Sequence, residues 1–264
     1  TCQNFEIIVI NDGSTDSNTN TLLDGLDFPK TQVLTTDNQG LPAARNYGIS
    51  KAIGDIIVTL DADDKFENTF FEKGLKLLEA NANIGVVSSY VKTFGTSSNF
   101  IQHYRSGGSE KFIGAMNNSG ASVMFLKKCW FEVGGYDETM RAGYEDWDFW
   151  IRVTYKGWQV KVIEDYLIYY RTHFSSMLTE TQKNRIPILK YIYNKNKAIF
   201  AKHMNEALIS RDKWNMEVEQ MYHGALKENH RLNTLINAIK KTWYFKMAMA
   251  VQKTKQSLLN FVKK

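Results

Sequence analysis

The amino-acid sequence predicts an α/β domain followed by an α-helical extension. Two apolar runs, 5–10 and 56–60, have the composition of buried strands, and each ends in a turn rich in acidic residues. A helical segment separates the two runs, and the order strand, helix, strand is typical of α/β folds. We therefore expect a first domain at 1–180 and a helical, basic C-terminal extension at 181–264.

Composition supports this organisation. The chain has 264 residues, of which 43% are hydrophobic, and this suffices for a core and about one to two domains. Cys2 and Cys129 are too few for a disulfide framework and suggest a reducing compartment, although a single bridge remains an alternative. Since no run of about 18 apolar residues exists, we expect no transmembrane helix.

Charge is distributed unevenly along the chain. Residues 1–180 contain 16 Lys and Arg against 23 Asp and Glu, whereas residues 181–264 contain 17 against 5. An acidic first part joined to a basic tail indicates that the tail meets something anionic. No RNA- or DNA-binding motif is present, so we do not expect a nucleic-acid partner.

The first apolar run leads into the polar turn 11–16, which contains Asp12. Ligands of open α/β sheets bind beyond the carboxyl ends of the strands, so Asp12 is a candidate ligand-binding residue. The alternative is that its carboxylate stabilises a local turn or caps a helix.

The second apolar run ends in three carboxylates, Asp61, Asp63 and Asp64. Carboxylates crowded on one turn repel one another unless a hard cation neutralises them. Mg²⁺ or Mn²⁺ held by few protein ligands completes its coordination shell with substrate phosphates. We therefore predict a divalent-metal site at this turn, with a solvated acidic loop as the alternative.

Arg45 lies near the start of a helix between the two acidic turns. Pro42 suits the first turn of this helix, and Gly54 can end it. A fixed cation at Arg45 could meet a pyrophosphate or pair with Asp61, and a surface ion pair with a nearby acid is the further alternative.

A third acidic segment, 143–157, has the pattern of a helix with acids at its positive end and Lys-Gly at its close. Helical spacing places Asp146 on the apolar face, together with Phe149, Trp150 and Val153. Burial should raise the pKa of Asp146, as a general base working near neutral pH requires. Asp148 lies one turn before Arg152 and is expected to pair with it in a structural role. Glu145 either orients a substrate or caps the helix.

His173 follows a stretch rich in β-type residues, 158–170. Neutral imidazole suits Mn²⁺ better than Mg²⁺, so His173 is a candidate metal ligand. A structural hydrogen-bonding role is the alternative.

Four sequence blocks resemble, in order and spacing, the motifs of inverting glycosyltransferase family 2, and together they cover roughly residues 3–176. These blocks are FEIIVINDGSTD, NQGLPAARNYGISKAIGDIIVTLDADD, GGYDE and GYEDWDFWIR. The resemblance implies a GT-A type nucleotide-sugar-binding domain with a mixed, mainly parallel sheet. It also implies a metal-dependent, inverting hexosyl- or N-acetylhexosaminyltransferase that uses a nucleotide-sugar donor, with UDP as the expected carrier.

The resemblance assigns a role to each matching residue. Asp146 takes the proton of the acceptor hydroxyl, beside Glu145. The nucleotide contacts Asp12, Arg45 and Asp61. Mn²⁺ or Mg²⁺ is held by Asp63, Asp61 and His173, with Asp61 and Asp63 forming the DXD motif. The implied acceptor is a cell-surface glycan or a lipid-linked sugar of polysaccharide biosynthesis in the cell envelope.

One departure from the family concerns the start of the chain. Family members carry an apolar strand and a helix ahead of the segment that corresponds to residues 4–6, and this chain has neither. We therefore expect an N-terminally incomplete domain. The alternative function is a nucleotide- or membrane-binding fragment without turnover.

The extension shows two patterns. Apolar residues at 3–4 spacing recur over 214–242, which predicts a helix that packs on the first domain or self-associates. Lysines alternate with aromatic and aliphatic residues over 240–264, a pattern that suits peripheral contact with an anionic bilayer. We accordingly expect a cytoplasmic protein that can lie at the inner face of the cytoplasmic membrane.

Overall fold

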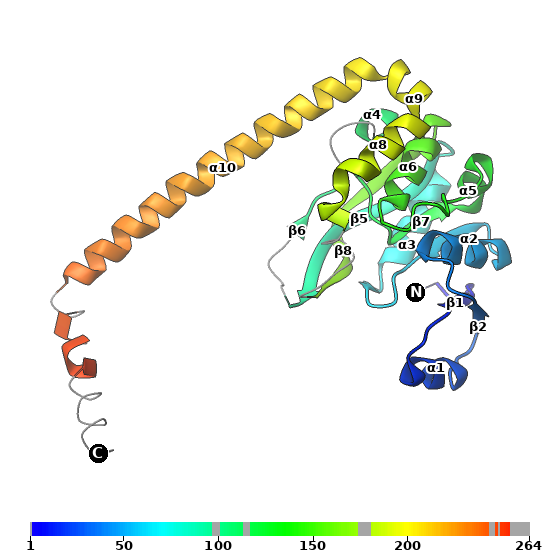
Figure 1. The fold of residues 1–264 in the computed structure, drawn as a ribbon, viewed down its shortest axis with the longest axis horizontal. Helices are drawn as coiled ribbons and strands as arrows, with labels where there is room; N and C mark the ends of the chain where they lie inside the picture. The colour runs from blue at the N-terminus through cyan, green and yellow to red at the C-terminus, as the bar shows by residue number, and fades with distance from the viewer. Residues whose placement is uncertain are drawn as a thin grey trace. The chain divides into compact units, whose positions relative to one another are not determined.

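The computed structural model describes residues 2–96, 101–112, 117–173, 181–242, 246–247 and 249–253 (Figure 1). Contacts divide the chain into a first compact unit, Thr1–Ser210, and a second unit, Arg211–Lys264. The boundary therefore falls after Ser210 rather than after residue 180, because two helices that follow residue 180 contribute to the first unit's core. Ile188, Ile192 and Ile199 are the buried residues that these helices supply.

The first unit begins with a small sheet of two parallel strands. β1 (Ile7–Asp12) pairs with β2 (Thr31–Thr36), and α1 (Ser17–Asp24) connects them. Asp16 caps α1, since its side chain accepts a hydrogen bond from the backbone N–H of Thr19. α2 (Leu41–Lys51) follows β2, with proline in its first turn as the sequence predicts.

The larger sheet contains six strands in the order β3-β7-β5-β8-β4, with β6 paired to β5. These strands are β3 (Ile56–Thr59), β4 (Lys65–Phe66), β5 (Ile84–Gly95), β6 (Ile101–Gln102), β7 (Val123–Leu126) and β8 (Gln159–Thr172). The mixed α/β sheet is confirmed. Only the long β5–β8 pair is parallel in this sheet, because the other connections return the chain in the opposite direction.

Alternation along the strands separates two apolar cores, one on each face of the large sheet. Val86 of β5 and Phe125 of β7 belong to the core that also contains the buried face of α6 (Glu145–Tyr155). Their neighbours Val87 and Met124 belong to the core beneath α3 (Phe70–Ala80). Successive side chains of a strand point to opposite faces, so this sheet is covered on both sides.

The remaining helices described for the first unit are α4 (Ser109–Phe112), α5 (Lys127–Val133), α8 (Arg185–Lys195) and α9 (Lys197–Lys202), of which α8 is as long as α6. Figure 1 shows α8 beside α6, and hydrogen bonds between the two helices agree with this view. The position of α8 matters for the site because α6 carries the Glu145-Asp146 pair.

The second unit is formed mainly by α10 (Met204–Lys241), which begins at the end of the first unit. Taken by itself, the part of α10 beyond Ser210 leaves its apolar residues exposed, among them Met221, Leu232, Leu235 and Ile239. The predicted helix over 214–242 is thus present. Most of the lysine-rich segment 240–264 lies outside the described residues. None of the described helices combines the length and the hydrophobicity that crossing a bilayer requires.

Candidate active site

The start of α6 has an unusual backbone. Tyr144, which precedes the helix, adopts the left-handed conformation with φ 59°, and Gly143 before it has φ 103°. Such a conformation in an aromatic residue is strained and persists only where its surroundings enforce it. Arg185 of α8 supplies one such contact by donating a hydrogen bond to the Tyr144 hydroxyl at 2.6 Å. This turn sets the direction in which Glu145 and Asp146 leave the backbone.

Arg45 joins the acidic turn after β3 to the start of α6. Its Nη2 lies 2.7 Å from Asp61 and its Nη1 lies 2.5 Å from Glu145. The Arg45 side chain is only 8% exposed, and although burial opposes ionisation, the two carboxylates raise its pKa. Arg45 is therefore a permanent cation whose two ends are already occupied, and the predicted Asp61 pairing is confirmed.

Glu145 is the first residue of α6 and follows the N-cap residue Tyr144. Glu145 is 3% exposed and its carboxylate pairs with Arg45. This ion pair holds the Glu145 side chain beside Asp146.

Among the residues that the structure describes, Asp146 is the carboxylate of this cluster that forms no ion pair. Burial, and next the charge of Glu145, raise its pKa to about 7. Arg45 and hydrogen bonds from the backbone N–H of Trp147 and from Asn117 Nδ2 act in the opposite direction and are too weak to cancel the rise. A carboxyl with this pKa exchanges a proton near neutrality, which is what a general base needs.

The helical-face argument was only partly right. Asp146 is partly exposed, whereas Asp148 is fully buried. α6 is covered on almost all sides, so the contrast between an apolar and a polar face does not decide which acid is buried. The raised pKa of Asp146 is confirmed, but it arises from the desolvated surroundings of the carboxylate and from Glu145.

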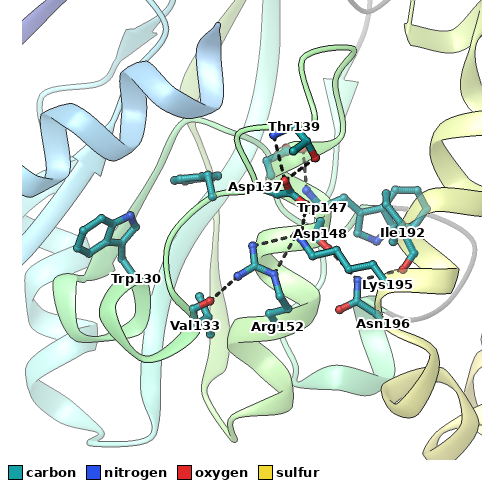
Figure 2. A network of polar contacts seen from close by, with 12 residues as sticks. Trp130, Val133, Asp137, Thr139, Trp147, Asp148, Arg152, Ile192, Lys195 and Asn196 are labelled. Atoms are coloured by element: carbon teal, nitrogen blue, oxygen red, sulfur yellow. Dashed lines mark hydrogen bonds and ion pairs between the residues drawn. The ribbon is translucent and has the colours of Figure 1, made fainter. Parts of the chain in front are cut away.

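Asp148 belongs to the buried polar network that Figure 2 shows. Arg152 donates to it from Nε at 2.8 Å, which confirms the predicted pair, and Lys195 Nζ and Asn196 Nδ2 each lie 2.8 Å from it. Lys195 also lies 2.6 Å from Asp137. Burial opposes ionisation of Asp137, but hydrogen bonds from Lys195, Thr139 and Tyr191 together lower the pKa of that carboxyl. The network locks α6 to α8 and to the turn that follows α5, and Asp148 is structural.

The acidic turn after β3 separates its three carboxylates. Asp61 faces Arg45, and Asp63 Oδ2 lies 2.9 Å from His173 Nε2 at an exposed position. Asp64 accepts hydrogen bonds from the Arg171 backbone N–H and the Ser122 hydroxyl, while burial raises its pKa to about 6. Within the described ranges, no three His, Cys, Asp or Glu side chains are grouped closely enough to hold a metal ion.

Asp12 holds the connection between β2 and α2. Its carboxylate accepts hydrogen bonds from the backbone N–H groups of Gln39 at 2.9 Å and Gly40 at 2.8 Å. These contacts agree with the alternative that the Asp12 carboxylate stabilises a turn. The turn is the one that leads into α2, however, and not the turn at residues 11–16.

The structure therefore brings the predicted residues together in two groups. Arg45 links Asp61 to Glu145, next to Asp146, while Asp63 meets His173. Asp12, the last residue of β1, belongs to neither group and binds the backbone just before α2. Sequence reasoning assigned no role to Asn117 or Tyr136, and it counted Asp64 only as one of the three carboxylates of the predicted metal turn. Tyr136 and Asp64 lie within recognised motifs, whereas Asn117 lies outside them. The contacts of all three residues come from distant segments of the chain.

Two solved structures of S. aureus TarS share this fold. S. aureus TarS 1-349 in complex with UDP-GlcNAc superposes with a TM-score of 0.55 at 14% identity, over 66% of this chain and 52% of that chain. S. aureus TarS gives a TM-score of 0.51 at 16% identity, over 68% of this chain and 33% of that chain. At these identities the likeness shows a shared fold.

Residues 1–145 match the family model described as Glycosyl transferase family 2, and the chain belongs to this family. A glycosyltransferase of Haemophilus influenzae is 44% identical over 30% of this chain and 32% of its own length. EpsH of Bacillus subtilis is 27% identical over 75% of this chain and 61% of its own length. An Escherichia coli relative, UDP-Gal:alpha-D-GlcNAc-diphosphoundecaprenol beta-1,3-galactosyltransferase, is 29% identical over 73% of this chain and 70% of its own length. The chain thus spans less than two thirds of the first two relatives.

Proposed function

We propose that this protein is a metal-dependent, inverting glycosyltransferase that moves a sugar from a UDP-sugar to a hydroxyl group of a lipid-linked or cell-surface glycan. The observation that carries the proposal is the pKa of about 7 at Asp146, a partly exposed carboxylate beside the Arg45–Glu145 ion pair. The UDP-GlcNAc complex of TarS and the lipid-linked acceptor in the name of the E. coli relative support the choice of substrates.

Asp146 is the proposed base. With a pKa of about 7, the Asp146 carboxyl is ionised in about half of the protein molecules at neutral pH. The ionised form can take the proton of an acceptor hydroxyl as that oxygen attacks the anomeric carbon. Glu145, held by its pair with Arg45, raises the basicity of Asp146 by its nearby charge. Attack from the face opposite the leaving diphosphate inverts the anomeric centre.

The nucleotide is proposed to lie over Asp12, Arg45 and Asp61. Because both ends of the Arg45 guanidinium are engaged, its role is to fix Asp61 and Glu145 and to offset their charge. Asp12 acts from the carboxyl end of β1, where it also orders the backbone that leads into α2.

Asp63 and His173 fit a divalent cation, because an exposed carboxylate and an imidazole in contact form a donor pair that suits Mn²⁺. Asp61 is the proposed third ligand; in the described structure it pairs with Arg45 and is not grouped with Asp63 and His173, so it must turn toward them when the cation binds. A bound Mn²⁺ or Mg²⁺ would offset the charge of the departing diphosphate. Asp63 and His173 orient each other through their 2.9 Å contact.

The second unit is proposed to attach the protein to a membrane surface or to a second copy of the chain. A helix that leaves its apolar residues exposed needs a partner surface, and basic residues near an anionic bilayer contribute about 1 kcal/mol each. We propose peripheral contact with the inner face of the cytoplasmic membrane through 240–264, with self-association through 214–242 as the competing arrangement.

The test is turnover by the complete natural protein. Purified protein with Mn²⁺ is incubated with UDP-GlcNAc, UDP-galactose or UDP-glucose, and release of UDP is measured with and without a lipid-linked sugar acceptor. The proposal expects UDP release from at least one donor, faster with acceptor, and loss of the reaction in Asp146→Asn. Binding of UDP without any turnover would favour the alternative of a nucleotide-binding protein without catalysis.

A further inference from the structure

Asn117, in the segment before β7, contacts the proposed base directly. Its Nδ2 donates a hydrogen bond to Asp146 Oδ2 at 2.8 Å, although the two residues are 29 positions apart in the chain. Its Oδ1 accepts a hydrogen bond from the backbone N–H of Ser119 at 3.3 Å. Because an amide side chain donates only from nitrogen and accepts only at oxygen, these two contacts fix its orientation. Asn117 therefore presents a donor to the Asp146 carboxylate.

Contacts on two sides anchor the segment 117–122, which begins with this asparagine. The carbonyl of Gly120 accepts a hydrogen bond at 3.1 Å from the indole of Trp150, which belongs to α6, the helix of the proposed base. The Ser122 hydroxyl donates to Asp64 at 3.2 Å, in the acidic turn after β3. One short segment is therefore tied both to the helix of the base and to the turn that carries the proposed metal ligands.

Both oxygens of the Asp146 carboxylate have a donor among the described residues. Oδ1 accepts from the backbone N–H of Trp147 at 2.8 Å, and Oδ2 accepts from Asn117. Two donors from different segments restrain rotation of the carboxylate about its last side-chain bond. Each carboxylate oxygen has about two acceptor sites, and these hydrogen bonds use one on each oxygen. The geometry thus fixes the plane of a partly exposed carboxylate while it leaves acceptor capacity for a hydroxyl group.

The charges around Asp146 give this donor a chemical role. The titratable groups that interact with Asp146 include Glu145, Arg45, Tyr104 and Tyr136. Burial raises the pKa of both phenols, which stay protonated. Burial and the neighbouring glutamate favour a proton on Asp146, whereas the arginine and the two hydrogen-bond donors favour its ionised form. A base must be ionised to take a proton, so the Asn117 amide opposes the effects that would keep this carboxyl protonated.

We propose that Asn117 is a positioning residue for the base: its amide holds the Asp146 carboxylate in one orientation and favours the form that takes the proton of the acceptor hydroxyl. This inference rests on the proposed function, because it assigns Asn117 a part in the same reaction. Asn117 acts through Asp146 and not on the substrate. A purely structural asparagine would instead affect folding, and its loss would lower transfer equally with and without the Asp146 carboxylate.

The experiment compares wild type with Asn117→Ala, Asn117→Asp and the matched control Ser122→Ala, all in the complete natural protein. Ser122 belongs to the same segment and also donates to a carboxylate, but to Asp64 instead of Asp146. Infrared titration follows proton binding by Asp146, which is read from the carboxyl band that is lost in Asp146→Asn. The pH dependence of kcat/KM for a UDP-sugar with acceptor is measured in parallel with thermal melting.

Loss of the donor in Asn117→Ala should move the midpoint of proton binding by Asp146 about one pH unit higher, as expected for one hydrogen bond to a charged group. At pH 7 the ionised fraction would then fall from about one half to about one tenth, so kcat/KM should fall about fivefold from this effect alone. Asn117→Asp keeps the shape of the side chain but adds a like charge, so its midpoint should move further.

Two controls separate positioning from folding. Ser122→Ala should leave the midpoint of Asp146 unchanged. When Asp146→Asn is already present, adding Asn117→Ala should change the residual transfer by less than about twofold, because residues that act through one another do not give additive losses.

The inference is overturned if Asn117→Ala and Asn117→Asp bind the Asp146 proton with the wild-type midpoint, whatever their melting temperatures. It is also overturned if Asn117→Ala lowers transfer equally with and without the Asp146 carboxylate. Neither result affects the proposed function as long as wild type transfers sugar. A wild-type protein that turns over no UDP-sugar would refute the proposed function itself, and the positioning role with it.

Discussion

Substitution of Asp146 by asparagine separates catalysis from stability. In wild type a pKa of about 7 means that about 10% of Asp146 is ionised at pH 6 and about 90% at pH 8. If Asp146 is the base, kcat/KM should rise roughly tenfold across this interval, whereas a carboxyl with an ordinary pKa would give a flat profile. Asp146→Asn should lower transfer by at least about 10²-fold and leave UDP binding near normal.

The same raised pKa makes the folded protein less stable as the pH rises, whereas activity is expected to increase. The pKa of Asp146 rises from 3.8 to about 7, so the folded protein holds a proton that the unfolded chain releases. Stability from this group is complete below about pH 4 and is lost as the pH rises to about 7. The shift sets an upper limit of about 4 kcal/mol, which solvent screening at this partly exposed site reduces to on the order of 1–2 kcal/mol.

Asp146→Asn should therefore melt at a higher temperature than wild type at pH 8, and the difference should shrink toward pH 4. Rate profiles and thermal melts between pH 4 and pH 8 measure both effects, with Asp148→Asn as the control. Asp148→Asn removes the carboxylate with which both Arg152 and Lys195 form ion pairs. The free energy of unfolding should therefore fall by on the order of 3–5 kcal/mol. If Asp146→Asn kept its activity and lost stability while Asp148→Asn did the reverse, the assignment of the two acids would be wrong.

Three further outcomes are expected. Lys195→Met should lower the melting temperature by several degrees in a fluorescence melt, because Lys195 bridges two carboxylates, whereas substitution of the exposed Lys197 should not. Asp63→Asn, or removal of the metal with EDTA, should largely abolish the binding of UDP measured by calorimetry. An affinity for UDP that is unchanged by EDTA would contradict the metal site. Removal of residues 240–264 should abolish sedimentation with phosphatidylglycerol vesicles, which salt should also weaken because exposed charges are screened over about 8 Å. A change in oligomer mass on removal, without vesicle binding, would instead support self-association.

Local patterns in the sequence were sufficient for several elements. The strands before Asp12 and Asp61 followed from short apolar runs that end in polar turns, and α6 followed from its acidic start and its Lys-Gly end. Arg152 lies four residues after Asp148, so their pairing is a property of helical spacing. Motif resemblance then placed these elements in a glycosyltransferase family. All of these inferences depend on residues that are close together in the chain.

Other features depend on contacts between distant segments, and local patterns do not encode them. The end of the first unit at Ser210 depends on the packing of α8 against α6, because Lys195 and Asn196 satisfy the buried Asp148. The strand directions in the large sheet depend on which connections cross it.

The ion pairing and the pKa values of the acidic side chains also depend on contacts between distant segments. By itself the sequence determined which carboxylates stand at strand and helix ends. Only the tertiary structure decided that Arg45 joins Asp61 to Glu145, while Asp146 forms no ion pair within the described part of the chain. The physical reason is that the pKa of a carboxyl depends on burial and on neighbouring charges, and here these come from segments about 100 residues apart, as in the Arg45–Glu145 pair.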